Sequence, residues 1–216
     1  MKGSEKMQLE RRHIDALGLA ESLIFHSDFC PYLELKEMLP DASALGRRRF
    51  RLLFTRFYNL DNAHLTDEFK ARFFEILFAG DVAANGKPAF SRILNELYEI
   101  RRKQGDRAMQ FSFVSKLVGI HHECSPIYDQ HVLRFFRGKP PTAREGNSFR
   151  INWFTNFLDD VADSYVAWAA DERMRPVVEK LKARDARLRE LDDVRLLDFL
   201  VWKAGNQKLL LHCDRT

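Results

Sequence analysis

The sequence lacks the marks of several large protein classes. Its three cysteines, Cys30, Cys124 and Cys213, are scattered and form no CxxC pair, a usage typical of reduced thiols in a cytoplasm. No apolar run approaches the roughly 20 residues that a membrane span requires, and residues 1–13 contain no apolar stretch of the kind found in a signal peptide. We therefore expect a cytoplasmic protein without a membrane segment.

Repeats, low-complexity tracts and Gly/Ser linkers are also missing, and strand signals are almost absent because no two-residue turn separates alternating runs. With 45% hydrophobic and 31% charged residues, the chain is not of the disordered class. A chain of 216 residues can bury a core without disulfides or metal. We expect one domain over 1–216, with a flexible segment at 1–8 and an internal loop at 139–147.

The pattern of apolar residues is helical through most of the chain. In residues 10–25, Ile14, Leu17 and Leu23 recur at the spacing of one helix face. Further helices are expected at 41–59, 65–80, 88–105, 106–122, 125–138, 148–172, 175–191 and 192–206. Residues 81–90 contain turn residues and predict a loop. The sequence thus predicts an all-α fold of eight to ten helices, with most of its 18 phenylalanines in the core.

Chemistry-bearing side chains gather in residues 112–136. The possible metal ligands there are His121, His122, Cys124, Asp129 and His131. Adjacent histidines on a helix point about 100° apart, and neither HExxH nor zinc-finger spacing occurs, so no metal or cofactor is expected. A serine nucleophile is not expected either, because the cluster of Ser112, Ser115 and Lys116 misses the SxxK spacing and the chain has no GxSxG.

Two other features bear on function. Asp129, in "PIYDQHV", stands at the expected start of a helix, where a carboxylate caps free amides or, facing a cleft, serves a reaction. A basic turn places four cations around a glycine: Arg101, Arg102, Lys103, Gly105 and Arg107. Between two helices, such a turn offers amides and charge to a phosphate, although cations at a helix end also complement its dipole.

The charge balance is mildly basic. The net charge of +4 and the isoelectric point near 9.0 permit nucleic-acid binding without requiring it. A second basic group lies at 46–51, "GRRRFR", and a third lies at 180–187. The third alternates with acidic residues and is typical of a solvated helix face.

The order of these features resembles the helix-hairpin-helix DNA glycosylase superfamily. Its motif follows a hairpin with a proline, an apolar residue and an aspartate, and "SPIYDQHV" is similar, with Pro126, Asp129 and Val132. "FSFVSKLVGIHHECSPIYDQHV" and "RLLDFLVWKAG" also look like a group of bacterial relatives of poorly defined activity. The resemblance implies an all-α fold, a hairpin that holds the DNA backbone and an aspartate that acts at a flipped nucleotide.

The departures from that pattern narrow the implied activity. The turn reads "RKQGDRA", with one glycine, and Gln110 stands where lyase members carry a lysine. Lys116 is rotated about 240° from that position. The resemblance therefore implies a monofunctional N-glycosylase of base excision repair, with Asp129 catalytic and Lys116 and Tyr128 as secondary candidates. The alternative is a catalytically inactive all-α binding module whose partner is unknown.

Overall fold

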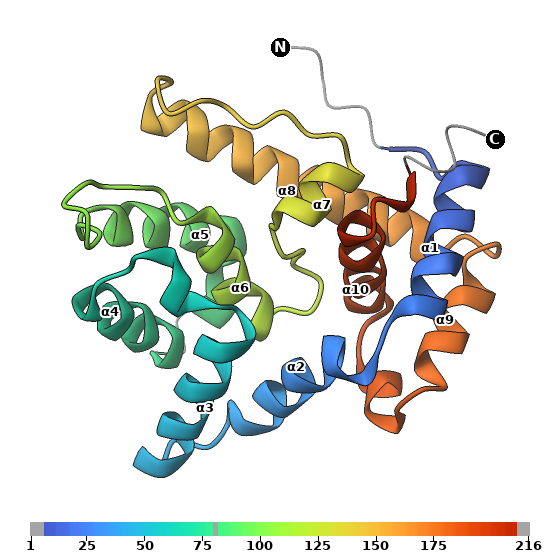
Figure 1. Ribbon diagram of the computed structural model, residues 1–216, viewed down its shortest axis with the longest axis horizontal. Helices are drawn as coiled ribbons and strands as arrows, with labels where there is room; N and C mark the ends of the chain where they lie inside the picture. The colour runs from blue at the N-terminus through green and yellow to red at the C-terminus, as the bar shows by residue number, and fades with distance from the viewer. Residues whose placement is uncertain (1–6, 80–81, 211–216) are drawn as a thin grey trace. The chain divides into compact units, whose positions relative to one another are not determined.

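The computed structural model describes residues 7–79 and 82–210 (Figure 1). Within these residues the chain forms ten α-helices and two short 3-10 helices, and no strand. This confirms the expected all-α fold of eight to ten helices. The loop expected at 139–147 lies between the seventh and eighth helices. Most of the segment expected to be flexible, 1–8, lies outside the described residues.

The contacts divide the chain into two compact units. Unit 1 comprises Met1–Asp28 and Glu123–Thr216, and unit 2 comprises Phe29–His122. One boundary falls inside helix α2 (His26–Met38) and the other directly after helix α6 (Phe111–His121). Each unit has its own set of buried side chains and is described by itself. The organisation as a single domain over 1–216 stays a prediction.

Helix α10 (Asp193–Asn206) is the central helix of unit 1. It packs against α1 (Arg11–Leu23), α7 (Gln130–Phe135), α8 (Asn147–Ala169) and α9 (Arg175–Lys182) (Figure 1). The helix begins after Asp192, whose side chain accepts a hydrogen bond from the Val194 amide at 2.8 Å, the usual function of an N-cap aspartate. Its buried residues lie on all sides, as expected for a helix surrounded by protein.

Gly205 allows α7 to approach α10 closely. A Cβ atom at this position would lie nearer to the carbonyl oxygen of His131 than any real contact permits. The close approach also lets the Nη1 atom of Arg134 donate to the Gly205 carbonyl oxygen at 2.8 Å. The two helices therefore meet backbone to backbone at a point where only glycine fits.

Trp168, near the end of α8, joins three helices of unit 1. Its ring stacks on His13 of α1, with centroids 5.8 Å apart, and on Phe136 after α7, at 5.6 Å. Its indole Nε1 donates to the carbonyl oxygen of Met7 at 3.2 Å. The apolar body of the tryptophan is thus buried while its polar atom is hydrogen bonded.

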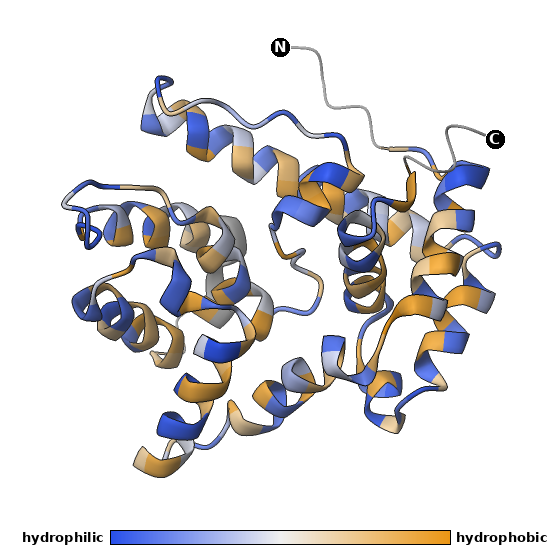
Figure 2. Cartoon of the chain, viewed as in Figure 1, coloured by the Kyte–Doolittle hydropathy of each residue, from blue (hydrophilic) through white to orange (hydrophobic). Residues whose placement is uncertain are grey.

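Unit 2 contains α3 (Ala44–Phe57), the 3-10 helix η1 (Leu60–Ala63), α4 (Asp67–Phe78), α5 (Val82–Tyr98) and α6. Hydrophobic and hydrophilic residues alternate along α3 and α4 (Figure 2), and the hydrophobic ones supply an aromatic core. Phe54 lies 5.5 Å from Phe73 and 5.7 Å from Phe74 between ring centroids, and all three are buried. The placement of phenylalanines in the core is confirmed at these positions.

Several helix boundaries differ from the predictions. Helix α2 was not predicted, because it contains Pro31 and has no apolar face of helical period; it begins where the Asp28 carboxylate accepts from the Phe25 amide. The predicted loop at 81–90 is wrong, because α5 starts at Val82. This helix ends at Tyr98 rather than at Gly105, and α6 begins at Phe111 rather than at 106.

None of the helices in the described ranges combines the length and the low charge that a membrane crossing requires.

Replacing Gly205 with alanine should lower the free energy of unfolding by about 1–3 kcal/mol or more, because the added Cβ forces α7 away from α10. The measurement is chemical denaturation with the melting temperature as a second readout. Gly18→Ala in α1 is the control, because its Cβ would make only an ordinary contact, 3.9 Å from Val177, and alanine favours the helix. Equal effects of the two variants would contradict the close approach.

Candidate functional site

Asp129 forms the N-cap of α7. Its backbone is extended, and its Oδ1 atom accepts a hydrogen bond from the His131 amide at 2.9 Å. The side chain is 20% exposed, and the same oxygen lies 3.9 Å from Nε2 of His131. Of the two roles considered for this aspartate, the capping role is therefore visible in the geometry. The carboxylate is still open to solvent in part.

The turn before Asp129 is held by a buried carboxylate on α10. Asp198, 4% exposed, accepts from Arg195 Nη1 at 2.5 Å, from the Tyr165 hydroxyl at 3.2 Å and from the Ile127 amide at 3.3 Å. Arg195 also donates through Nη2 to the carbonyl oxygen of Ser125 at 2.7 Å. Additional hydrogen bonds reduce the cost of a buried ion pair, and the turn supplies two of them, an amide to Asp198 and a carbonyl to Arg195. The Nε atom of Arg195 is buried without a hydrogen bond in the described structure.

Burial changes the titration of this network. It raises the pKa of Asp198 to about 6, even though Arg195, the Ile127 amide and Tyr165 each oppose that shift. Burial, followed by the nearby charge of Asp198, raises the pKa of Tyr165 well above its ordinary range. The phenol therefore remains a hydrogen-bond donor under all ordinary conditions.

The candidate Tyr128 takes part in an aromatic cluster. Its ring meets Phe154 edge to face with centroids 4.5 Å apart and Phe157 at 6.0 Å. Burial and then the charge of Asp129 raise the pKa of Tyr128 to about 12. The contacts account for the tyrosine as a packing residue, while its role as a secondary candidate for the reaction stays a prediction.

The basic turn is a loop from 99 to 110 rather than a junction between two helices. Gly105 has a φ of 83°, a left-handed conformation that glycine adopts without strain. Since α6 begins only at Phe111, the free amides of that helix are not adjacent to Gly105. The phosphate site inferred from a glycine turn feeding a helix is therefore not assembled in that form.

Three arginines of this loop have local partners. Arg101 donates to the carbonyl oxygen of Gly105 at 2.5 Å, Arg102 is paired with Asp106, and Arg107 lies 3.0 Å from Glu99. The remaining cation, Lys103, is exposed, and its backbone amide donates to the His64 carbonyl at 2.9 Å. The loop is thus partly neutralised by its own acids.

Lys116 is buried in α6, 8% exposed. Its Nζ atom donates to the Ser112 hydroxyl at 2.9 Å and lies 5.2 Å and 5.4 Å from the ring centroids of Tyr58 and Phe113. Cation–π attraction of this kind acts on the charged ammonium.

The candidate residues are divided between the two units. Asp129 and Tyr128 share one turn in unit 1, whereas Lys116 and the basic loop belong to unit 2.

The histidines that could suggest a metal have other partners. Nε2 of His121 donates to the Leu77 carbonyl and Nε2 of His122 to the Val82 carbonyl, each at 2.9 Å, and burial lowers the pKa of His121. Cys124 is a free thiol 3.6 Å from Asp192, and burial raises its pKa. Across the described ranges no three His, Cys, Asp or Glu side chains are grouped to hold a metal. Cys213 lies outside those ranges.

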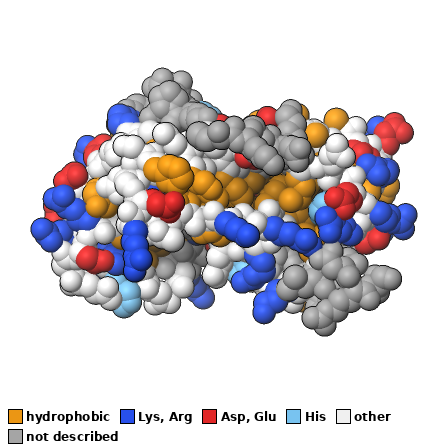
Figure 3. Space-filling view, turned by 90° about the horizontal axis from the view of Figure 1, so that it is seen from above, with side chains coloured by type: hydrophobic (Ala, Val, Ile, Leu, Met, Phe, Trp, Pro, Cys, Tyr) orange, Lys and Arg blue, Asp and Glu red, His pale blue; other side chains and the backbone are white. Residues whose placement is uncertain are grey.

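The charge of the chain is divided unequally between the units. Unit 2 carries 15 Lys and Arg against 11 Asp and Glu, whereas unit 1 carries 20 of each. The whole excess of +4 therefore belongs to residues 29–122. Several Lys and Arg side chains on the face drawn in Figure 3 lie beside hydrophobic or uncharged surface rather than beside acids.

Half of the exposed Lys and Arg side chains that the structure describes in unit 2 lie on helix α3. Its five exposed arginines are Arg47, Arg48, Arg49, Arg51 and Arg56. No acidic side chain in the described part of the chain forms an ion pair with any of them. Arg47 lies over the ring of Phe78 at 5.3 Å and Arg51 over Phe74 at 5.5 Å. The sequence identified 46–51 as basic, but it did not show that no described acidic side chain lies within ion-pair distance of these arginines; the acidic side chain that acts on them electrostatically is Asp41, through Arg49.

Neither a known family model, nor a curated protein, nor a solved structure matches this chain significantly.

If Asp129 acts as a helix cap, Asp129→Ala should lower the free energy of unfolding by about 1 kcal/mol, whereas Asp129→Asn should change it little, because asparagine caps as well as aspartate. Both variants are compared with wild type by chemical denaturation. An equal loss in the two would show that the negative charge, and not the hydrogen bond to the His131 amide, is what matters.

The raised pKa of Asp198 predicts a pH effect. The pKa of the Asp198 carboxyl rises from its ordinary value of 3.8 to about 6 on folding, so between these values the folded chain holds a proton that the unfolded chain has released. Protonation of Asp198 therefore stabilises the folded state fully below about pH 4, and this contribution is lost as the pH rises through about 6. The advantage of wild type over Asp198→Asn in unfolding free energy should therefore shrink by up to about 3 kcal/mol over that interval. Denaturation at several pH values measures it, and a constant or growing advantage would contradict the shift.

Proposed function

We propose that the protein binds DNA and that α3 of unit 2 contacts the phosphate backbone. The observation that carries the proposal is the set of five exposed α3 arginines, none of which forms a close ion pair with a described acidic side chain, although Asp41 lies near enough to interact electrostatically with Arg49. Affinity for DNA arises largely from such cations, which neutralise phosphates and release counterions. Unit 1, in contrast, has balanced charges.

The form of α3 supports this role. Its 14 residues extend about 21 Å at a rise of 1.5 Å per residue, and a helix of ordinary width is admitted by the major groove, which is about 12 Å wide. The contacts of Arg47 and Arg51 with Phe78 and Phe74 restrain two of the cations before any ligand arrives. Ser43 caps the helix by accepting from the Gly46 amide at 3.0 Å, which fixes where α3 begins.

The loop from 99 to 110 contributes less to the proposed binding. Arg102 and Arg107 would have to leave Asp106 and Glu99 to contact phosphates, and surface ion pairs of this kind exchange at little cost. Lys103 is exposed and needs no such exchange. We therefore rank the loop as a secondary contact, behind α3.

A monofunctional N-glycosylase of base excision repair is the second candidate, and one observation favours it. The Asp129 carboxylate remains 20% exposed beside Tyr128, so a developing positive charge on a sugar could be stabilised there. This candidate requires wild type to release bases from damaged duplex and Asp129→Asn to lose that activity. The binding role is favoured because the hydrogen bond to His131 and the aromatic contacts already account for both side chains. A cytoplasmic location remains a prediction.

The test of DNA binding is the salt dependence of affinity for an undamaged duplex, measured by fluorescence anisotropy. Each phosphate contact contributes about 0.9 to the slope of log affinity against log salt. The double variant Arg48→Gln/Arg49→Gln should lower that slope by about two and weaken binding at low salt. Both side chains are exposed, so the fold should be unaffected.

Arg189→Gln is the matched control, because Arg189 is an exposed arginine of unit 1, in the 3-10 helix η2 (Ala186–Glu190). It should leave affinity and slope at the wild-type values. No binding by wild type at low salt would refute the proposal and direct attention to a protein partner. A slope that is the same in the double variant, the control and wild type would refute the role of α3.

A further inference from the structure

The solvent face of α3 carries two leucines as well as arginines. Leu45 is 58% exposed and Leu52 is 65% exposed. A single exposed leucine needs no explanation, but these two stand seven residues apart, which places them only about 20° from each other around the helix. The two side chains therefore form an apolar ridge along the outside of α3.

Arginines flank this ridge on both sides. At about 100° per residue, Arg48 lies about 40° to one side of Leu52, whereas Arg49 lies about 60° to the other side. Arg56 follows one turn later, about 40° from Leu52. All of these side chains are exposed, and the opposite side of the helix carries the buried Phe54. The solvent face of α3 thus has an apolar centre and a cationic rim.

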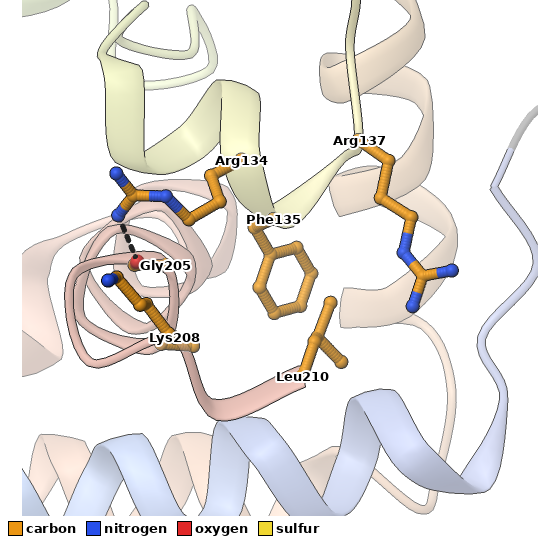
Figure 4. A pocket seen from close by; sticks show the side chains of 7 residues that line it. Arg134, Phe135, Arg137, Gly205, Lys208 and Leu210 are labelled. Atoms are coloured by element: carbon orange, nitrogen blue, oxygen red, sulfur yellow. Dashed lines mark hydrogen bonds between the residues drawn. The ribbon is translucent and has the colours of Figure 1, made fainter. Parts of the chain in front are cut away.

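An arginine of unit 1 illustrates a different use of the same side chain. Figure 4 shows Arg134 donating to the carbonyl oxygen of Gly205, at 2.8 Å, so that this guanidinium stabilises the end of a helix of its own chain. The rim arginines of α3 form no close ion pair with a described acid, and the acidic side chain that acts on them electrostatically is Asp41, through Arg49. The face suits an anionic ligand that also presents apolar groups.

The major groove of DNA offers both properties. Phosphates border the groove, and each thymine places a C5-methyl group on its floor, where apolar side chains contact it. Leu45 and Leu52 are about 10.5 Å apart along the helix axis, at 1.5 Å per residue, and this is about the rise of three base pairs. A helix in the groove can therefore direct its rim to the phosphates and its ridge to methyl groups about three pairs apart.

We propose that Leu45 and Leu52 contact thymine methyl groups in the major groove, so that α3 favours A·T pairs. The proposal rests on the proposed binding of DNA by α3 and adds a preference for base sequence to it. Contacts with phosphates position a protein on the duplex but carry no sequence information directly. The two leucines are therefore specificity-determining residues of this interface, and the rim arginines supply most of the affinity.

An anionic membrane also combines negative charge with apolar groups, but it fits this face less well. A helix that lies in a membrane surface buries a broad apolar face between the headgroups, and the apolar stripe of an ordinary amphipathic helix is at least about 100° wide. The ridge of α3 covers only about 20°, with arginines close on both sides. The narrow ridge favours the groove.

The test compares two duplexes by fluorescence anisotropy with the full chain. One consists of alternating A·T pairs, and the other has deoxyuridine in place of every thymidine, which removes the methyl groups and keeps the pairing. Wild type should bind the thymidine duplex about tenfold more tightly, since burial of each methyl group contributes about fourfold. The double variant Leu45→Ala/Leu52→Ala should bind both duplexes equally, with the salt dependence of wild type. Alanine favours a helix, so the variant should fold.

Leu19→Ala is the matched control, because Leu19 is an exposed leucine of α1 in unit 1, and it should keep the thymidine preference. Salt-dependent binding by wild type without that preference, or a preference that survives in the double variant, would overturn the proposal and leave DNA binding by α3 intact. Failure of wild type to bind either duplex at low salt would refute both. If wild type shows no thymidine preference but sediments with vesicles of anionic phospholipid, and the double variant does not, the ridge belongs to a membrane contact instead.

Discussion

A carboxylate buried in the middle of α10 determines the arrangement of much of unit 1. Asp198 must be hydrogen bonded because an unpaired buried charge is very unfavourable, and its donors come from α10, α8 and the turn before α7. Satisfying one side chain therefore fixes three segments with respect to one another. The start of α7 at Asp129 and its close approach to α10 at Gly205 follow from that arrangement.

The two units use their charges in different ways. Unit 1 has equal numbers of acids and bases and places several of them inside, as in the pairs of Arg195 with Asp198 and of Lys203 with Asp28. Unit 2 leaves the α3 arginines at the surface. A charge that is buried with its partner serves the fold, whereas a charge that is exposed without one is available to a ligand.

The sequence predicted what depends on local pattern and missed what depends on distant contacts. The apolar period of α10 and the position of Asp129 before a helix were sufficient to place both. Two charges inside the apolar run "VRLLDFLV" were the available signal for a buried ion pair. Their bonds to Ser125 and Ile127 join residues about 70 positions apart, and no spacing rule reaches that far. Helix α2 was missed because Pro31 and a uniform distribution of apolar residues hide its period.

The histidines at the end of α6 bear on the order in which unit 2 can fold. His121 and His122 bond to the carbonyl groups of Leu77 and Val82, which lie at the end of α4 and the start of α5. These bonds close loops of 44 and 40 residues. Closing a loop lowers the conformational entropy of the chain, and the bonds stabilise unit 2 only if they offset that cost. On a growing chain, neither bond can form until α6 has left the ribosome. The carbonyl groups of Leu77 and Val82 thus acquire these hydrogen bonds only after every helix of unit 2 has been synthesised.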